Sequence, residues 1–307
     1  NDWNSHTDHR CCFGTRHSKG TAGELLYLKI FYPAHHRTEV KDMSKWIRFR
    51  RQNSETEELG KLLDDVEFEN QRVAVCSGEL FNGAEPTDEV LPVSDLVLLT
   101  PCWPGKMIGL WKNVRSAAEK QGLTIPEEPL YFLKPNNCFL PHLGEIRRPD
   151  YYDGRIIYEG ELGVVIGKTC RNVSVQEASD YIFGYTCVND VTALTLIDKD
   201  PSFPQWCRAK SMDTFGAFGP SITTDIDVTQ LRVQTLYRGK LRQDYPISDL
   251  IFSPQQIVSL LSQDMTLLAG DLIACGTGEG VLPIKPGNTI EVCIEGLDTL
   301  SNMMAVD

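Results

Sequence analysis

Short apolar runs, each about as long as a β-strand and bounded by turn residues, recur along most of this sequence. The clearest is the run at residues 162–167, and comparable runs stand at residues 181–188, 272–275 and 289–294. A continuous apolar run of this length between turn signals is typical of a buried strand. The sequence therefore predicts a fold built mainly from β-strands.

Helix signals are few. Ser253-Pro254 begins the clearest helix, because serine caps a helix N-terminus and proline is tolerated in the first helical turn. A second, short helical stretch lies near residues 114–121 and is closed by Gly122, a typical C-cap residue. The predicted fold class is therefore α+β, predominantly β.

Three segments can be distinguished along the chain. Residues 1–42 hold five of the six histidines and show no sustained periodicity, so we expect a non-native or disordered extension, with a functional arm as the alternative. Met43 opens an alternating, strand-like stretch, and residues 43–100 are predicted to form a small β-rich N-terminal domain. Two prolines and a tryptophan at residues 101–104 indicate a linker to a larger domain at residues 101–307.

Charge and composition exclude some classes of partner. The formal net charge of −12 at pH 7 argues against nucleic acid and anionic membranes, since both bind positively charged surfaces. No apolar stretch approaches the roughly 20 residues that a membrane-spanning helix needs. The ten cysteines contain no C-x-x-C pair and are interpreted as reduced thiols. We therefore expect a cytoplasmic protein.

Three carboxylates are placed to meet at the ends of two predicted strands. Glu159 and Glu161 are two residues apart, so in an extended strand both point to the same face. The next strand along the chain ends at Asp190. If these strands are neighbours, the three carboxylates form a site for a hard cation such as Mg²⁺, Mn²⁺ or Ca²⁺. Solvated acidic residues at strand ends remain the alternative interpretation.

The order of several motifs resembles the fumarylacetoacetate hydrolase family. The stretch at residues 158–168 is similar to the family's glutamate-x-glutamate-leucine segment, and residues 184–193, 208–215 and 276–281 follow as further family-like motifs. The resemblance covers roughly residues 101–304. It implies a catalytic domain with a mixed β-sandwich roll, like the family's C-terminal domain. It also implies a homodimer and a small keto or enol acid as substrate.

The resemblance also assigns roles to single residues. Glu159, Glu161 and Asp190 correspond to the family's metal ligands, with Mg²⁺ (or Mn²⁺ or Ca²⁺) as the expected cofactor. The family lysine corresponds to Lys210, which would neutralise a substrate carboxylate or a developing enolate; an exposed surface lysine is the alternative. Gly276-Thr277 corresponds to a loop that lines the substrate pocket.

One departure from the family pattern bears on the reaction. Hydrolytic members carry a histidine–glutamate pair where this chain has Arg115 and Ala118, with Glu119 one place further. Arginine stays protonated and cannot serve as the general base that activates water. We predict instead that Arg115 contributes positive charge, and that Glu119 or His142 would have to replace the missing base if water is activated.

A second departure concerns the substrate pocket. The family often carries an arginine and a glutamine shortly after the aspartate ligand, whereas Leu194 and Ile197 stand near those places here. The pocket is therefore expected to differ from that of the best-known members.

These observations favour decarboxylation or isomerisation of keto–enol dicarboxylic acids. The expected type is a 2-hydroxyhepta-2,4-diene-1,7-dioate isomerase or an oxaloacetate decarboxylase, because stabilising an enolate with a metal and a lysine needs no strong base. A carbon–carbon bond hydrolase of the acylpyruvate or fumarylacetoacetate type is the first alternative. A catalytically silent relative that binds metal and a keto acid is the second.

Overall fold

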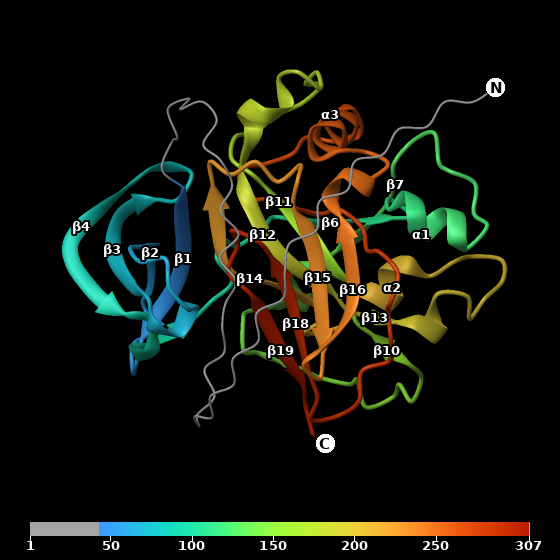
Figure 1. Cartoon of the computed structure of the whole chain (residues 1–307), viewed down its shortest axis with the longest axis horizontal. Helices are drawn as coiled ribbons and strands as arrows, with labels where there is room; N and C mark the ends of the chain where they lie inside the picture. Colours follow the sequence, from blue (N-terminus) through green and yellow to red (C-terminus); the bar gives the residue numbers. More distant parts are fainter. Residues whose placement is uncertain (1–42, 307) are drawn as a thin grey trace, which may run out of the picture. The chain divides into compact units, whose positions relative to one another are not determined.

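The computed structural model describes residues 43–306, so the predicted extension at residues 1–42 lies outside the described part of the chain. Strands predominate over helices within it, which confirms the predicted fold class (Figure 1). No helix among residues 43–306 is long and apolar enough to span a membrane.

The largest of the three sheets within residues 43–306 has twelve strands. In spatial order they are β4 (Asn82–Pro92), β3 (Arg72–Glu79), β2 (Glu57–Leu62), β1 (Ser44–Arg51), β14 (Gly216–Thr224), β12 (Ile182–Asp190), β11 (Gly160–Ile166), β17 (Leu272–Ala274), β6 (Met107–Trp111) and β7 (Leu130–Lys134), with β5 (Leu96–Leu98) beside β1 and β8 (Phe139–Leu140) beside β14. Strand β11 is buried along its whole length, as its apolar run predicts.

The other two sheets are smaller. One contains β16 (Lys240–Pro246), β15 (Arg232–Tyr237), β18 (Thr289–Ile294), β19 (Leu300–Met304) and β9 (Glu145–Ile146), and the other pairs β10 (Ile156–Ile157) with β13 (Thr192–Ala193). Strands β15 and β18 pack against β11 and β12, and their buried side chains share one core (Figure 1). This layered, mostly β arrangement agrees with the fold that the family resemblance implies.

Helices occupy the connections between strands. They are α1 (Arg115–Lys120), α2 (Trp206–Lys210) and α3 (Pro254–Asp264), with short 3₁₀ helices η1 (Phe68–Asn70), η2 (Val93–Asp95), η3 (Asn136–Cys138), η4 (Ala178–Tyr181), η5 (Leu194–Leu196) and η6 (Ile247–Asp249). The predicted cap of α3 is confirmed, because Ser253 Oγ accepts a hydrogen bond from Gln256 N at 3.3 Å and Gln256 Oε1 accepts one from Ser253 N at 2.8 Å.

The N-terminal strands extend the large sheet. Strand β1 pairs antiparallel with β14, so the sheet continues from β11, β12 and β14 through β1 to β4. The N-terminal strands nevertheless have a small core of their own, centred on Ile47, Phe49 and Val73. The predicted linker contains Cys102, which is 1% exposed and packs in the core of the large sheet, so this segment is part of the packed structure.

Candidate metal centre

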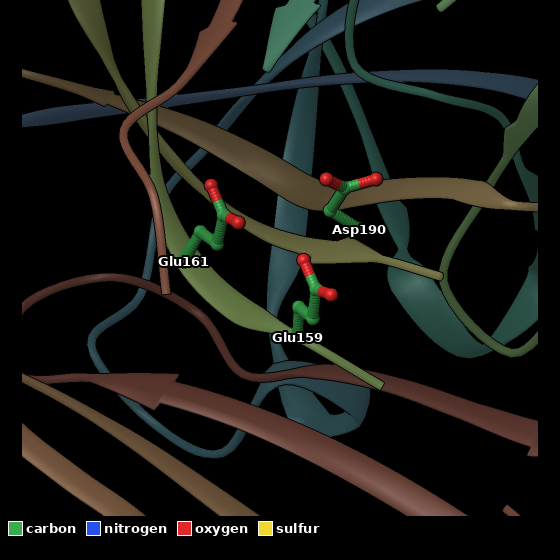
Figure 2. Close-up of side chains that lie close together, drawn as sticks. All are labelled: Glu159, Glu161 and Asp190. Carbon is green, nitrogen blue, oxygen red and sulfur yellow. The ribbon is translucent and has the colours of Figure 1, made fainter. Parts of the chain in front are cut away.

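The carboxylates of Glu159, Glu161 and Asp190 converge on one point (Figure 2). Strands β11 and β12 are antiparallel neighbours, with Gly160 opposite Asn189, so the start of β11 lies beside the end of β12. One ligand atom from each carboxylate lies within 4.8 Å of the other two. The two strands are therefore neighbours and the three carboxylates lie close together, as expected.

Two lysines compensate most of this negative charge. Lys210 Nζ, at the end of α2, donates to Glu159 Oε2 at 2.5 Å and to Asp190 Oδ2 at 2.6 Å. Lys134 Nζ, at the end of β7, donates to Asp190 Oδ1 at 2.6 Å and is fully buried. Three ionised carboxylates and two ammonium groups leave one negative charge in excess, which is costly in a buried site unless a proton or a further cation binds.

The neighbours of each group shift its pKa. Burial, followed by the charges of Asp190 and Glu159, raises the pKa of Glu161 well above its usual value, and burial also raises the pKa of Glu159. Burial alone would raise the pKa of Asp190, but the charges of Lys134 and Lys210 outweigh it and lower that pKa. Burial opposes the charged form of Lys210, yet Asp190 and Glu159 outweigh it and raise the pKa of the ammonium. Within residues 43–306, Glu161 is therefore the one of the three carboxylates that forms no ion pair with a lysine.

One main-chain amide and one side-chain hydroxyl fix the orientation of two of these carboxylates. Gly276 N donates to Glu161 Oε2 at 2.6 Å, and Thr192 Oγ1 donates to Glu159 Oε1 at 3.2 Å. Gly276 has a φ of 96°, and a Cβ there would lie 3.0 Å from the Cβ of Asn113. A glycine is therefore needed where this loop approaches the ligand.

A hydrogen-bond network ties the same loop to strand β11. Tyr245 OH lies 3.0 Å from Gly160 O and 2.9 Å from Gly276 O, bridging the strand and the loop. Gln243 accepts from Gly160 N at 3.0 Å and donates to Thr277 Oγ1 at 2.8 Å, while Thr277 Oγ1 donates to Gly160 O at 3.0 Å. The loop and the first ligand strand are thus held together by side chains from β16.

A cavity of about 550 Å³ opens beside the carboxylates. Glu159, Lys210 and Thr277 line it, as the resemblance implies for a substrate pocket. Much of the remaining wall is aromatic and aliphatic, and Trp206 stacks on Phe132 with ring centroids 5.9 Å apart. An apolar wall strengthens electrostatic interactions between the charged groups and a bound ligand.

Arg115 and Glu119 do not line this cavity. Helix α1 begins at Arg115 and buries Ala117 and Ala118, which do line the cavity, so the residues at positions 115 and 119 fall on its exposed face. The described structure therefore places Arg115 and Glu119 on the exposed side of the predicted helix, away from the cavity lining, and their catalytic role stays a prediction.

His142 also lies apart from the carboxylates. It lines a second cavity of about 850 Å³, which shares no lining residue with the first. Its Nδ1 accepts a hydrogen bond from Ser301 N at 3.0 Å, and its ring packs edge-on against Phe68. Burial lowers the pKa of His142 to about 4. This environment is that of a packed structural histidine.

Sequence reasoning missed several residues of the site. Lys134, Gln243 and Tyr245 touch the ligands or the loop that holds them, although they come from β7 and β16. Only Lys134 had a local signal, because a lysine directly follows the apolar run at residues 130–133. Gln243 and Tyr245 lie in a stretch with no distinguishing pattern.

The described residues fit a divalent cation. Three convergent carboxylates provide the oxygen ligands that Mg²⁺, Mn²⁺ and Ca²⁺ prefer, and Glu161, the group without a cationic partner, carries the excess charge.

Bound Mn²⁺ is expected to raise the melting temperature, by an amount that grows with pH. The raised pKa of Glu161 means that, above the usual carboxyl pKa, the folded protein keeps a proton that the unfolded chain has lost. The metal-free protein therefore loses stability as pH rises from the usual carboxyl pKa toward the raised pKa of Glu161. At the lower end of this pH window, Mn²⁺ must displace the proton from Glu161 before it can bind. Asp190, with a lowered pKa, titrates below this window.

We expect saturating Mn²⁺ to raise the melting temperature by on the order of 5 °C at about pH 7.5, and by less at about pH 5.5. Differential scanning fluorimetry with and without MnCl₂ measures both rises. Equal rises at the two pH values would contradict the role of Glu161 as a ligand.

Comparison with known proteins gives two family matches. The model described as fumarylacetoacetate (FAA) hydrolase, C-terminal, matches residues 106–305, and a model described as Rv2993c-like, N-terminal, matches residues 44–101. A protein of Archaeoglobus fulgidus is 42% identical over 236 residues, which cover 74% of this chain and 93% of that protein. The oxaloacetate tautomerase YisK of Bacillus subtilis is 36% identical over 238 residues, covering 72% of this chain and 78% of that protein.

Solved structures show the same fold. The 2-hydroxyhepta-2,4-diene-1,7-dioate isomerase of Mycobacterium marinum superposes with a TM-score of 0.77 at 33% identity, covering 85% of this chain and 98% of that one. Fumarylpyruvate hydrolase of Pseudomonas aeruginosa, in complex with Mn²⁺ and pyruvate, superposes with a TM-score of 0.62 at 26% identity, covering 72% of this chain and 93% of that one.

Proposed function

Because this chain belongs to the fumarylacetoacetate hydrolase family, we propose that it is a divalent-metal-dependent enzyme that isomerises or decarboxylates keto–enol dicarboxylic acids. Glu159, Glu161 and Asp190 hold Mg²⁺ or Mn²⁺ in this proposal, and Lys210, Gly276 and Thr277 contact the substrate. Family membership also supports a cytoplasmic homodimer with a small N-terminal domain at residues 43–100 and a catalytic domain at 101–307.

The observation that carries the proposal is the composition of the cavity wall. Among the described residues that line it, cations and carboxylates are present but no histidine is. Hydrolysis of a carbon–carbon bond requires a base that titrates near neutral pH to activate water. Enolate formation by decarboxylation or tautomerisation depends mainly on electrostatic stabilisation of negative charge, which the wall provides.

The residues of this chain have separate tasks in such a reaction. A bound divalent cation supplies Lewis-acid polarisation of the keto oxygen. Lys210, held as a cation by Glu159 and Asp190, donates hydrogen bonds to negative charge that develops on the substrate. Phe132 and Trp206 form the apolar wall beside Lys210, whose Nζ lies 4.8 Å from the Phe132 ring centroid. They keep water from competing for that ammonium.

The relatives favour the same reaction class. One is named an oxaloacetate tautomerase and a structural neighbour is named a dioate isomerase. A hydrolase of the acylpyruvate type is the second candidate, supported by the structural neighbour named fumarylpyruvate hydrolase. In that case Glu279, which lines the cavity, would be the carboxylate available to act on water.

A proton NMR time course with Mg²⁺ separates these candidates. Oxaloacetate, 2-hydroxyhepta-2,4-diene-1,7-dioate and an acylpyruvate are offered in parallel, with EDTA and Mg²⁺-only samples as controls for spontaneous change. We expect Mg²⁺-dependent tautomerisation or loss of carbon dioxide from a diacid, with the acylpyruvate unchanged. Cleavage of the acylpyruvate into two acids would establish the hydrolase instead. Binding without any product would indicate a catalytically silent relative.

A further inference from the structure

Arg155 lines the cavity beside the carboxylates and has an uncommitted side chain. It is exposed, and within residues 43–306 its guanidinium has no hydrogen bond, ion pair or ring contact. Its backbone is fixed, because Arg155 O accepts hydrogen bonds from Tyr152 OH at 2.8 Å and from Leu194 N at 2.9 Å. The backbone of Arg155 is therefore fixed by hydrogen bonds, while the donors of its guanidinium remain available for a ligand.

The other cations of the cavity wall are already engaged. Lys210 is paired with two ligand carboxylates, and Lys120 is paired with Glu279. Lys112 Nζ lies over the Trp111 ring, 5.0 Å from its centroid. Arg155 is thus the lining cation, among the described residues, whose side chain has no partner within the protein.

The surroundings of Arg155 are apolar. Leu194, Ile197, Val281 and Pro283 line the same cavity, and none of them offers the guanidinium a partner. A carboxylate brought there by a ligand would meet a planar, five-donor group suited to bidentate contact. The contact would be weakened by solvent at the exposed side of the cavity, so its contribution is moderate.

We propose that Arg155 binds the second carboxylate of the substrate and so sets the preference for diacids, an inference that rests on the proposed function. Arg155 precedes Glu159 by four residues, so their Cα atoms are at most about 14 Å apart. The second carboxylate of a keto diacid whose head lies beside Glu159 and Lys210 can therefore meet the Arg155 guanidinium within the same cavity.

Binding of two matched ligands to the Mn²⁺-loaded protein tests this inference without requiring turnover. 2-Oxoadipate and 2-oxohexanoate share the keto acid head and the chain length, but only the first has a second carboxylate. By isothermal titration calorimetry we expect 2-oxoadipate to bind about tenfold more tightly. Arg155→Met should remove this preference by weakening 2-oxoadipate alone, and Arg155→Lys should keep part of it.

Arg147→Met is the matched control, because Arg147 is exposed, is paired with Glu145 and does not line the cavity. It should keep the wild-type preference. Equal binding of the two ligands by the wild-type protein, or a preference that survives Arg155→Met, would overturn the inference while leaving the proposed function intact. If neither ligand binds in the presence of Mn²⁺, the proposed function fails and the inference fails with it.

Discussion

Replacing Glu161 with glutamine is expected to abolish metal-dependent turnover while leaving the fold intact. Glutamine has nearly the same shape, and its carbonyl oxygen can still accept the hydrogen bond from Gly276 N that Glu161 Oε2 accepts at 2.6 Å. The variant loses one of the three carboxylates proposed to bind the metal, the one to which no lysine among residues 43–306 is hydrogen-bonded. Changes in groups that only support a ligand lower metal affinity by roughly 10- to 100-fold. Loss of a ligand should therefore lower metal affinity by more than about 100-fold.

The metal-free form of this variant provides the control for folding. Burial and the two neighbouring carboxylates disfavour a charge at position 161, and the variant removes that charge. The melting temperature of metal-free Glu161→Gln should therefore equal or exceed that of the metal-free wild type. Isothermal titration with Mn²⁺ and an activity assay measure the loss, and Glu128→Gln, at an exposed glutamate, should behave as wild type. Wild-type Mn²⁺ affinity in Glu161→Gln would remove Glu161 from the metal site.

The proximity of the three carboxylates was predictable because local geometry places them. Alternation along an extended strand sends Glu159 and Glu161 to one side whatever the rest of the fold does. Asp190 required one further condition, that β11 and β12 be neighbours, and consecutive antiparallel strands commonly pair. The family resemblance added Lys210, whose place at the end of α2 has no local signature.

Lys134 could not be placed in the same way. It lies on β7, which is separated from β11 by β6 and β17 in the sheet order. Its contact with Asp190 therefore depends on the order of strands that are far apart in the sequence. Gln243 and Tyr245 depend equally on how the five-stranded sheet packs against β11.

Arg115 shows why a sequence pattern that predicts a helix does not fix which way each side chain points. The expected helix forms at Arg115–Lys120, but its buried face carries Ala117 and Ala118. A shift of one or two positions around a helix turns a residue from the cavity to solvent, since neighbours along the chain point in different directions. Arg155, by contrast, stood in no family motif and attracted no prediction, although it lines the cavity.

Replacing Lys134 with methionine is expected to destabilise the metal-free protein by about 3–5 kcal/mol. Lys134 is fully buried and donates to Asp190 Oδ1 at 2.6 Å, so its loss leaves Asp190 with Lys210 as its remaining cationic partner. Methionine preserves most of the apolar stem, which separates the loss of charge from the loss of packing. Urea denaturation measures the free energy of unfolding, and Lys168→Met, at an exposed lysine, should change it by less than about 0.5 kcal/mol.

A second substitution and added Mn²⁺ show whether charge is the cause. Lys134→Met combined with Asp190→Asn should recover part of the lost stability, because the carboxylate that lost one of its two cationic partners is neutralised as well. Mn²⁺ should stabilise Lys134→Met more than it stabilises the wild type, since the cluster then carries two negative charges in excess and the ion replaces the missing cation. If Lys134→Met unfolds with the wild-type free energy, or if Mn²⁺ stabilises both proteins equally, Lys134 does not act as a counter-charge to the metal site. Protons, and not the lysines, would then have to neutralise the buried carboxylates. The charge balance inferred from Lys134 and Lys210 would be incorrect.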